Sequence, residues 1–274
     1  MAITNFIPTI WSENLISSLN NQYVGVANCN RDYEGEIKQR GSSVKICDIG
    51  DITVGDYTKD TDMNLPQELS DTLVELVIDK AKYFNFQVDD IDKTQCSPKL
   101  LETAMRKAAN SLSNEADRYV YSLYTEAAHE VGIVAPGESI VEGIIKAKVM
   151  LYHNNVSNPD DVVIEIAPEV AAHLIIDQIE SFSYNNDIIT SGCIGTIAGS
   201  KVYVSNNIVR DEEDTFCCLV RSKRAIAFAE QLSEIEAYRP EKRFADAVKG
   251  LHLYGAKVVH PNEMVKLMVS VNTK

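Results

Sequence analysis

One uninterrupted helical pattern, running from Ser97 to His129, constrains the fold more than any other feature of the sequence. Apolar residues recur every three or four positions along it, with charged residues between them. These positions are Leu101, Met105, Ala108, Leu112, Ala116, Tyr119, Leu123 and Ala127. Ser97 suits the N-cap, Pro98 suits the first helical position, and neither Gly nor Pro follows until Gly132. At 1.5 Å per residue the helix would be roughly 45 to 50 Å long, so the pattern predicts an elongated molecule built on a spine.

Extended segments precede this helix. Two runs of mostly β-branched and aliphatic residues, 44–49 and 72–79, alternate with the period of a β-strand. The polar stretch between them, 55–71, is typical of the tip of a long hairpin. Because an isolated two-stranded hairpin is at best marginally stable in water, we expect this one to lie against another element or another subunit.

The first 40 residues are polar and carry few large apolar side chains, among them Phe6, Ile10 and the only tryptophan, Trp11. Such a segment cannot build a core of its own, and we expect it to be an arm that is held by something else. Our hypothesis is that Phe6 and Trp11 anchor it on a neighbouring subunit. No basic run or cleavage pattern predicts a signal peptide, and no run of about 18 or more apolar residues predicts a membrane span.

After Gly132 the pattern becomes that of a compact α/β region. Helices are predicted over 138–152 and 168–179, and strands over 161–166 (VVIEI), 201–205 (KVYVS) and FCCLV at 216–220. Further strands are predicted within 225–231, 251–259 and 264–271.

The sequence carries no constellation typical of catalysis. Gly192, Gly195 and Gly199 fit neither phosphate-loop spacing, so we expect a plain loop there. The five histidines and six cysteines form no zinc spacing or disulfide framework. Cys217 and Cys218 fit a buried strand, in which a free thiol acts as a small apolar group.

The charge balance argues against a protein that binds nucleic acid across a broad surface. With 26 Lys and Arg against 40 Asp and Glu, the net charge is −14, whereas a broad grip on nucleic acid needs clustered basic residues. Two basic runs remain, RSKR at 221–224 and RPEKR at 239–243, and each is more typical of a solvated face than of a site. Separated charge clusters also steer subunit contacts, so we hypothesise that Arg239, Lys242 and Arg243 face acidic clusters of adjacent subunits.

Several stretches of the chain resemble the major capsid proteins of tailed bacteriophages with the Hong Kong 97 fold. They are NFIPTIWSENL at 5–15, KYFNFQVDDIDKTQ at 82–95, GSKVYVSNN at 199–207 and AFAEQLSEIEAYRPEKRFADAVKGLHLYGAKVVHP at 227–261. The resemblance covers nearly the whole chain and implies an α+β fold in four parts. These parts are an N-arm at 1–40, an E-loop hairpin at 41–92, a peripheral domain with the spine helix at 93–132 and 230–260, and an α/β axial domain at 133–229 and 261–274.

The resemblance implies a structural protein with no catalytic residue, cofactor or metal. Its hexamers and pentamers would tile an icosahedral shell that encloses packaged double-stranded DNA without reading its sequence. The shell would be a virion capsid assembled in the bacterial host cytoplasm. Since no long helical extension precedes the arm, a separate scaffolding protein is implied, together with a portal and room for decoration proteins.

Two alternatives stay open beside this interpretation. The first is an encapsulin-like nanocompartment shell, which shares the fold but encloses a cargo enzyme. The weaker second is an α/β enzyme that uses the loop from Gly192 to Gly199 for a phosphate ligand. A last feature concerns the shell itself: the founding member of the family joins its subunits by a covalent Lys to Asn bond, and Lys59, near the expected hairpin tip, is the only lysine placed for that role. Lone surface lysines are usually just solvated, so this crosslink carries little weight.

Overall fold

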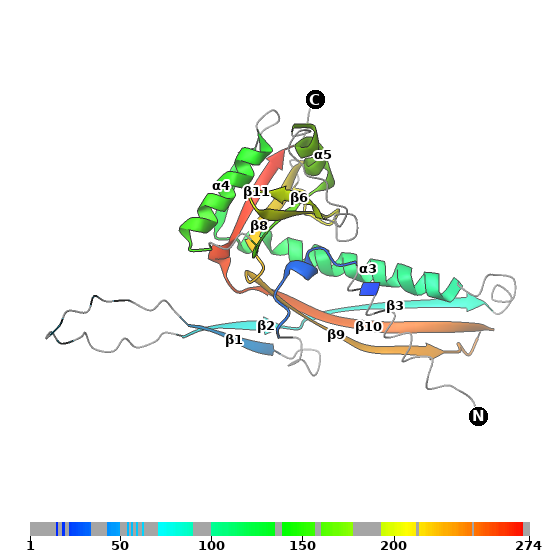
Figure 1. The fold of residues 1–274 in the computed structure, drawn as a ribbon. Helices are drawn as coiled ribbons and strands as arrows, with labels where there is room; N and C mark the ends of the chain where they lie inside the picture. The colour runs from blue at the N-terminus through cyan, green and yellow to red at the C-terminus, as the bar shows by residue number, and fades with distance from the viewer. Residues whose placement is uncertain are drawn as a thin grey trace.

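Two bodies and a projecting hairpin make up the structure, which is a computed structural model (Figure 1). It describes residues 15, 18–19, 22–33, 43–49, 54, 56, 59, 62, 71–89, 100–134, 139–156, 160–177, 193–211, 214–242 and 244–270. The α+β fold class is confirmed, since long strands and long helices occur in separate layers. None of the helices in these described ranges is long and apolar enough to cross a membrane.

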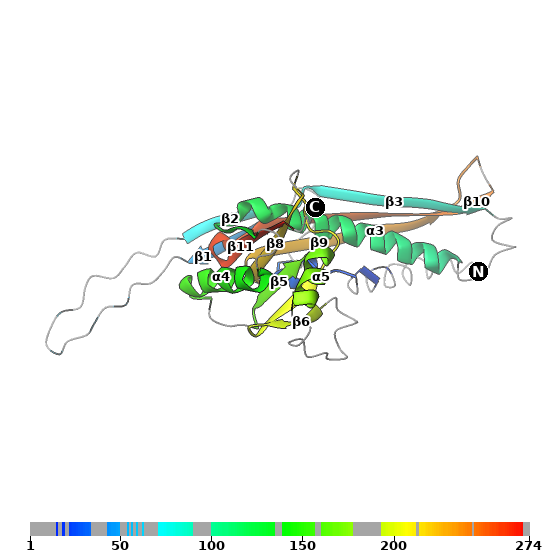
Figure 2. The same cartoon turned by 90° about the horizontal axis from the view of Figure 1, so that it is seen from above.

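The long body consists of a helix laid along a three-stranded sheet (Figures 1 and 2). The helix is α3 (Leu100–Ser122), and the antiparallel sheet has the order β3 (Lys80–Asp89), β10 (Ala245–Val258) and β9 (Ile226–Tyr238). Met105, Ala109, Leu112, Ala116 and Val120 form the buried stripe of α3 and belong to the main core. Their spacing is that of one helix face, as the sequence predicts.

The compact body is a six-stranded mixed sheet with two helices. The strand order is β4 (His129–Val134), β11 (Met264–Ser270), β8 (Thr215–Ser222), β5 (Val162–Ile166), β7 (Ser200–Val204) and β6 (Cys193–Ile197). Helix α4 (Ile140–His153) packs on β4, β11 and β8 and touches α5 (Pro168–Asp177). Every residue of β5 and β8 is buried, which fits the continuous apolar runs of their sequences.

The hairpin of β1 (Ser43–Ile49) and β2 (Asp71–Val77) is a separate two-stranded antiparallel sheet. One of its faces is buried against the start of β9 and the end of β10. The residues of this small second core are Val44, Ile46, Leu76, Ile78, Ala227, Ala229 and Leu253. The approach is so close that a Cβ on Gly255 would lie 2.3 Å from the carbonyl oxygen of Val77, and only glycine fits there.

The chain passes between the two bodies at 123–129, 222–226 and 258–264, and these crossings are bonded to one another. The carbonyl of Ala225 accepts from the N–H groups of Val259 at 2.9 Å and His260 at 3.2 Å, and the carbonyl of Pro261 accepts from Ala128 at 3.1 Å. We call this cluster, residues 127–128, 223–225 and 259–263, the junction.

Two expected elements need correction here. The helix expected through His129 ends earlier: α3 stops at Ser122, a 3₁₀ turn covers Leu123–Glu126, and His129 begins β4, because Ala127 takes an extended conformation. Within the expected loop at Gly192 to Gly199, Cys193–Ile197 form β6, and a tight turn at Ala198 and Gly199, both with positive φ, leads into β7. The phosphate-loop alternative fails at this point, since no helix N-terminus follows the glycines. Ser97 and Pro98 lie outside the described residues.

The hairpin also differs from its expected extent of 41–92. The first two strands pair as predicted, but 80–89 leaves the hairpin and joins the three-stranded sheet as β3. Its alternating exposed and half-buried residues face solvent on one side and α3 on the other. The hairpin strands therefore end at Val77, and Ile78 and Asp79 link them to the long body.

Candidate functional site

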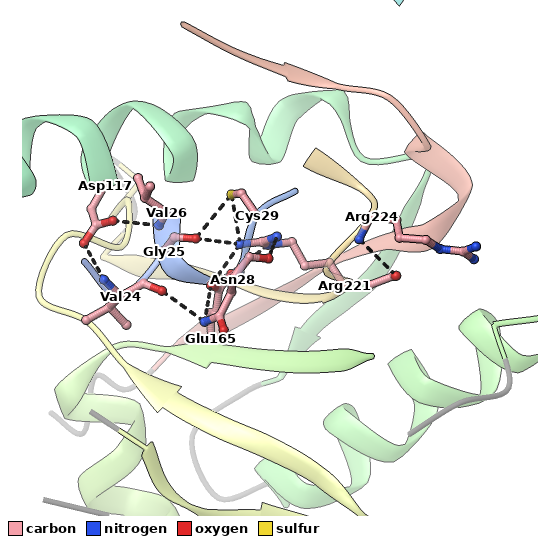
Figure 3. Close-up of polar contacts among 10 residues, drawn as sticks. Val24, Gly25, Val26, Asn28, Cys29, Asp117, Glu165, Arg221 and Arg224 are labelled. Carbon is pink, nitrogen blue, oxygen red and sulfur yellow. Dashed lines mark hydrogen bonds and ion pairs between the residues drawn. The ribbon is translucent and has the colours of Figure 1, made fainter. Parts of the chain in front are cut away.

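A short N-terminal segment is built into the interior where the two bodies meet (Figure 3). We call residues 23–31 the staple. Its centre is a 3₁₀ turn, Val26–Asn28, in which the N–H groups of Asn28 and Cys29 donate to the carbonyls of Gly25 and Val26. Tyr23, Val26 and Cys29 are buried, as are Leu15 and Leu19 ahead of the staple. The expectation that the first 40 residues need another chain to bury their apolar groups is wrong for these residues, which join the main core of their own chain.

The compact body holds the staple through a fully buried ion pair. Arg221 of β8 donates from Nε to Oε2 of Glu165 at 2.9 Å and from Nη2 to Oε1 at 3.0 Å, and both side chains are 0% exposed. The remaining guanidinium donors reach the staple backbone: Nη1 donates to the carbonyl of Asn28 at 2.8 Å, and Nη2 to that of Gly25 at 3.1 Å. The amide of Asn28 donates to Glu165 Oε1 at 3.3 Å. A buried arginine needs such complete pairing, because an unpaired buried charge is strongly destabilising.

Helix α3 holds the same turn from the opposite side. Asp117 Oδ1 accepts from the backbone N–H of Val26 at 2.9 Å, and Oδ2 accepts from that of Val24 at 3.1 Å. Burial raises the pKa of Asp117 to about 6, although the donated N–H groups act in the other direction. One turn along α3, the ring of Tyr121 lies so close that a Cβ on Gly25 would be 2.9 Å from its Cζ. The turn therefore fits α3 only with glycine at that position.

Both ends of the staple return to one carboxylate of the long body. Tyr23 Oη donates to Glu230 Oε2 at 2.5 Å, and Arg31 Nη2 donates to Oε1 at 2.5 Å. His252 Nε2, on the neighbouring strand β10, lies 2.8 Å from Oε2. Although burial opposes it, the hydrogen bonds from His252 and Tyr23 and the charge of Arg31 hold the pKa of Glu230 below its ordinary value. Just beyond, Asn30 pairs with the start of β9, where the N–H of Phe228 donates to the Asn30 carbonyl at 2.8 Å.

The chemistry of this cluster is structural. Arg221, Glu165 and Asp117 spend their polar atoms on one another and on staple backbone groups. Burial raises the pKa of the Cys29 thiol to about 11, which is the opposite of what a nucleophile needs. Across the described part of the chain, His, Cys, Asp and Glu side chains form no group of three or more that could hold a metal ion.

Sequence reasoning missed this cluster. RSKR is expected to be a solvated run, but its first residue, Arg221, is fully buried, while Arg224 of the same run is exposed and lies 2.8 Å from Glu263. The usable signal was Glu165, a charged residue inside VVIEI, because a charge in a buried strand requires a partner of opposite sign. Which arginine forms the ion pair with Glu165 depends on the pairing of β5 with β8, and that pairing cannot be predicted from a local sequence pattern.

The residues proposed for subunit contacts are only partly visible. Arg239 and Lys242 are exposed in the turn between β9 and β10, and Lys59 is exposed. Phe6, Trp11 and Arg243 lie outside the described residues. Of the three that are described, Arg239 and Lys242 share one turn, and the role of all six stays a prediction.

Large apolar side chains are exposed on the hairpin and on α4, and also at Tyr83, Phe244 and Leu251 of the long body. On the hairpin, Leu73 and Val77 are 52% and 44% exposed on the face that points away from the long body. On α4, Ile145, Val149 and Tyr152 form an exposed stripe at helical spacing, beside a groove of about 790 Å³ between α4 and the edge strand β4. Apolar groups gathered in this way are typical of surfaces that bind other proteins.

No protein-family model matches this chain, and no curated protein sequence matches it. Solved structures do match. A structure from Mycobacterium phage Che8 has a TM-score of 0.68 and 27% identity, covering 90% of this chain and 91% of that one. The capsid of Ralstonia phage GP4 has a TM-score of 0.66 at 12% identity, with 92% and 90% covered. A virus-like particle from Pyrococcus furiosus has a TM-score of 0.61 at 11% identity, with 95% and 99% covered, and at these lower identities the likeness concerns the fold.

Proposed function

We propose that this chain, which has the Hong Kong 97-type fold of tailed-phage capsid proteins, is a major capsid protein that assembles into the head of a tailed bacteriophage. The observation that carries the proposal is the match to the Che8 phage structure, which runs over nine tenths of both chains at 27% identity. The long body then corresponds to the peripheral domain, the compact body to the axial domain and β1–β2 to the E-loop.

The physical character of the chain supports an assembled state. The hairpin and α4 expose apolar side chains that no described residue covers, and a hairpin of two strands gains little stability alone. Heterologous contacts, in which different surfaces of identical subunits meet, generate closed rings and shells. The stability of such a shell is the sum of many modest contacts. The neighbouring copy is the partner that the proposal supplies for these surfaces.

The finer parts of the proposal concern the particle. Hexamers and pentamers would form an icosahedral shell around double-stranded DNA, with assembly in the bacterial host cytoplasm, a separate scaffolding protein and a portal. The net charge of −14 suits a wall that lets packaged DNA slide past without sticking. Phe6, Trp11, Arg239, Lys242 and Arg243 remain the proposed subunit contacts. We expect Trp11→Ala to lower particle yield, and Arg243→Glu to lower it in a way that depends on salt.

A second candidate is the shell of an encapsulin-like nanocompartment. The observation in its favour is the virus-like particle from Pyrococcus furiosus, of which 99% is covered by this chain. The phage assignment is preferred because the identity to the Che8 structure is 27%, against 11% for that particle.

Electron microscopy combined with nuclease protection tests the proposal. Particles purified from infected cells should be closed shells that protect long double-stranded DNA and carry one tail vertex. Shells that enclose a protein cargo and no protected DNA would favour the nanocompartment. A chain that stays monomeric under all assembly conditions would contradict both candidates.

A further inference from the structure

We propose that the staple, residues 23–31, fixes the angle between the compact body and the long body, and thereby sets the curvature of the shell that the subunits build. The part concerning curvature rests on the proposed function. The part concerning the angle rests only on the contacts within one chain.

The junction alone is an incomplete constraint. The three chain crossings are gathered in one place and bonded to each other there, around Ala225 and Pro261. Loop clusters of this kind are where hinges between domains are built. Away from the junction the two bodies share the main core, and the side-chain amide of Asn207 donates to Asn114 Oδ1 of α3 at 2.9 Å in an exposed place. Apolar packing and one exposed bond do not specify a single geometry, so a fixed angle needs a further, buried polar attachment away from the junction.

The staple provides this attachment, because it is bonded to β8 on one side of the junction and to β9 on the other. From Ala225 the chain runs back along β8 to Arg221, at most about 13 Å of chain, and forward along β9 to Glu230, at most about 17 Å. The staple is bonded at both points: Gly25 and Asn28 accept from Arg221, and Tyr23 and Arg31 donate to Glu230. Junction, Arg221 and Glu230 thus form a triangle whose third side is the staple. A triangle with three fixed sides has fixed angles.

The third side is also held against the spine. Asp117 of α3 accepts two staple N–H groups (Figure 3). The ring of Tyr121 abuts Gly25. Sliding of the staple would leave Arg221 Nη1 without its acceptor, the Asn28 carbonyl, and would break the bonds from Nη2 to the Gly25 carbonyl and from the Asn28 side chain to Glu165. The arrangement is therefore specific to one position, because unpaired polar groups in a buried place are costly.

Two independent variants release the staple. Gly25→Ala places a Cβ 2.9 to 3.2 Å from the Tyr121 ring and pushes the turn off α3 and Arg221, and Gly132→Ala is its matched control, because a Cβ there meets nothing within 4 Å. The double variant Tyr23→Phe/Arg31→Ala removes both bonds to Glu230, and Arg31→Lys, which keeps a cation there, is the conservative control. If Gly25→Ala does not fold, the double variant decides, since Arg31 lies near the surface with its side chain 29% exposed.

Three readouts separate the possible results. Hydrogen exchange of 23–31 in unassembled subunits reports release, with acceleration of about tenfold or more expected. Spin labels carried by unnatural amino acids at Lys146 on α4 and Lys249 on β10 report the angle, and their distance distribution should broaden about twofold on release. Electron microscopy of assembled particles reports curvature, and the released variants should form shells of mixed diameter while both controls match wild type.

Each outcome decides the proposal. Faster exchange with unchanged label distances would overturn it, and so would unchanged exchange in both variants, because the named contacts would then not hold the segment. Broadened distances with shells of wild-type diameter would overturn the link to curvature. If wild type forms no shells while the distances still broaden on release, the proposed function fails and the role of the staple in fixing the angle stands.

Discussion

The staple and the β1–β2 hairpin are close neighbours in sequence, and both are expected to reach for another chain, yet the structure treats them in opposite ways. The staple is enclosed by α3, β5, β8 and β9 of its own chain and satisfies a buried arginine. The hairpin buries one face and presents Leu73 and Val77 on the other. The contrast shows that a polar composition does not make a segment an arm, because backbone carbonyls and N–H groups can be what the interior needs.

Among these predictions, replacing Arg221 should cause the largest loss of stability. Arg221→Met leaves Glu165 buried and charged without its partner, so we expect the free energy of unfolding to fall by about 3 to 5 kcal/mol. Arg224→Met in the same RSKR run is the matched control and should cost about 0 to 1 kcal/mol, because the Arg224 side chain is 63% exposed. Chemical denaturation of unassembled subunits measures both. Equal losses would show that the staple and its anchor add nothing beyond a surface ion pair.

The two faces of the hairpin should respond differently to truncation. Leu76→Ala removes a fully buried side chain from the second core, and we expect the stability of the subunit to fall by about 2 to 4 kcal/mol. Leu73→Ala on the exposed face should change the stability of the subunit by less than about 0.5 kcal/mol and should instead lower the yield of assembled particles. A Leu73→Ala protein that assembles at wild-type yield would show that this face does not contact a neighbour.

The contributions of Asp117 and Glu230, the two carboxylates bonded to the staple, to the stability of the subunit should depend on pH with opposite signs. The pKa of Asp117 is raised from 3.8 to about 6, so the folded state binds this proton more tightly than the unfolded state does. Its contribution is fully present below pH 3.8 and is lost as the pH rises through about 6, an effect of order 1 to 3 kcal/mol. The advantage of wild type over Asp117→Asn should therefore grow as the pH falls from 7 to about 4. The pKa of Glu230 is lowered from 4.5, so its contribution is present above pH 4.5, and the advantage of wild type over Glu230→Gln should shrink as the pH falls below about 4.5. Denaturation at several pH values measures both differences, and slopes of the same sign would contradict the assignment.

The smallest effect is expected at Lys59. Lys59 is exposed, and lone surface lysines are usually just solvated, so we expect a single monomer band from purified particles on denaturing gels. Lys59→Arg should leave the band pattern unchanged. A ladder above the monomer that disappears in Lys59→Arg would establish a covalent crosslink at the hairpin.

Helices and strands are predicted from the sequence better than the pairing of one strand with another. The spine helix, the paired strands of the hairpin and the buried strands VVIEI and FCCLV follow from local periodicity, and the structure has them in place. The strand formed by 193–197 escaped prediction because its glycines are typical of loops, while its stability comes from pairing with β7. Likewise, β3 is not part of the hairpin, because it pairs along its whole length with β10, which is far away in the sequence and longer than β2.

The candidate site was the least predictable part for the same reason. Asp117, Glu165, Arg221 and the turn at 25–28 come from distant parts of the sequence and meet only in the fold. Periodicity reports which residues face inward, but it does not report which two buried charges will lie side by side.

Hydrogen exchange measured on assembled particles and on unassembled subunits distinguishes the enclosed staple from the exposed hairpin. We expect the amides of the hairpin, 43–49 and 71–77, to become more protected on assembly, because neighbouring copies cover the exposed face. We expect equal protection of 23–31 in both states, because that segment is already enclosed by its own chain. Strong new protection of 23–31 on assembly, with the hairpin unchanged, would contradict both expectations.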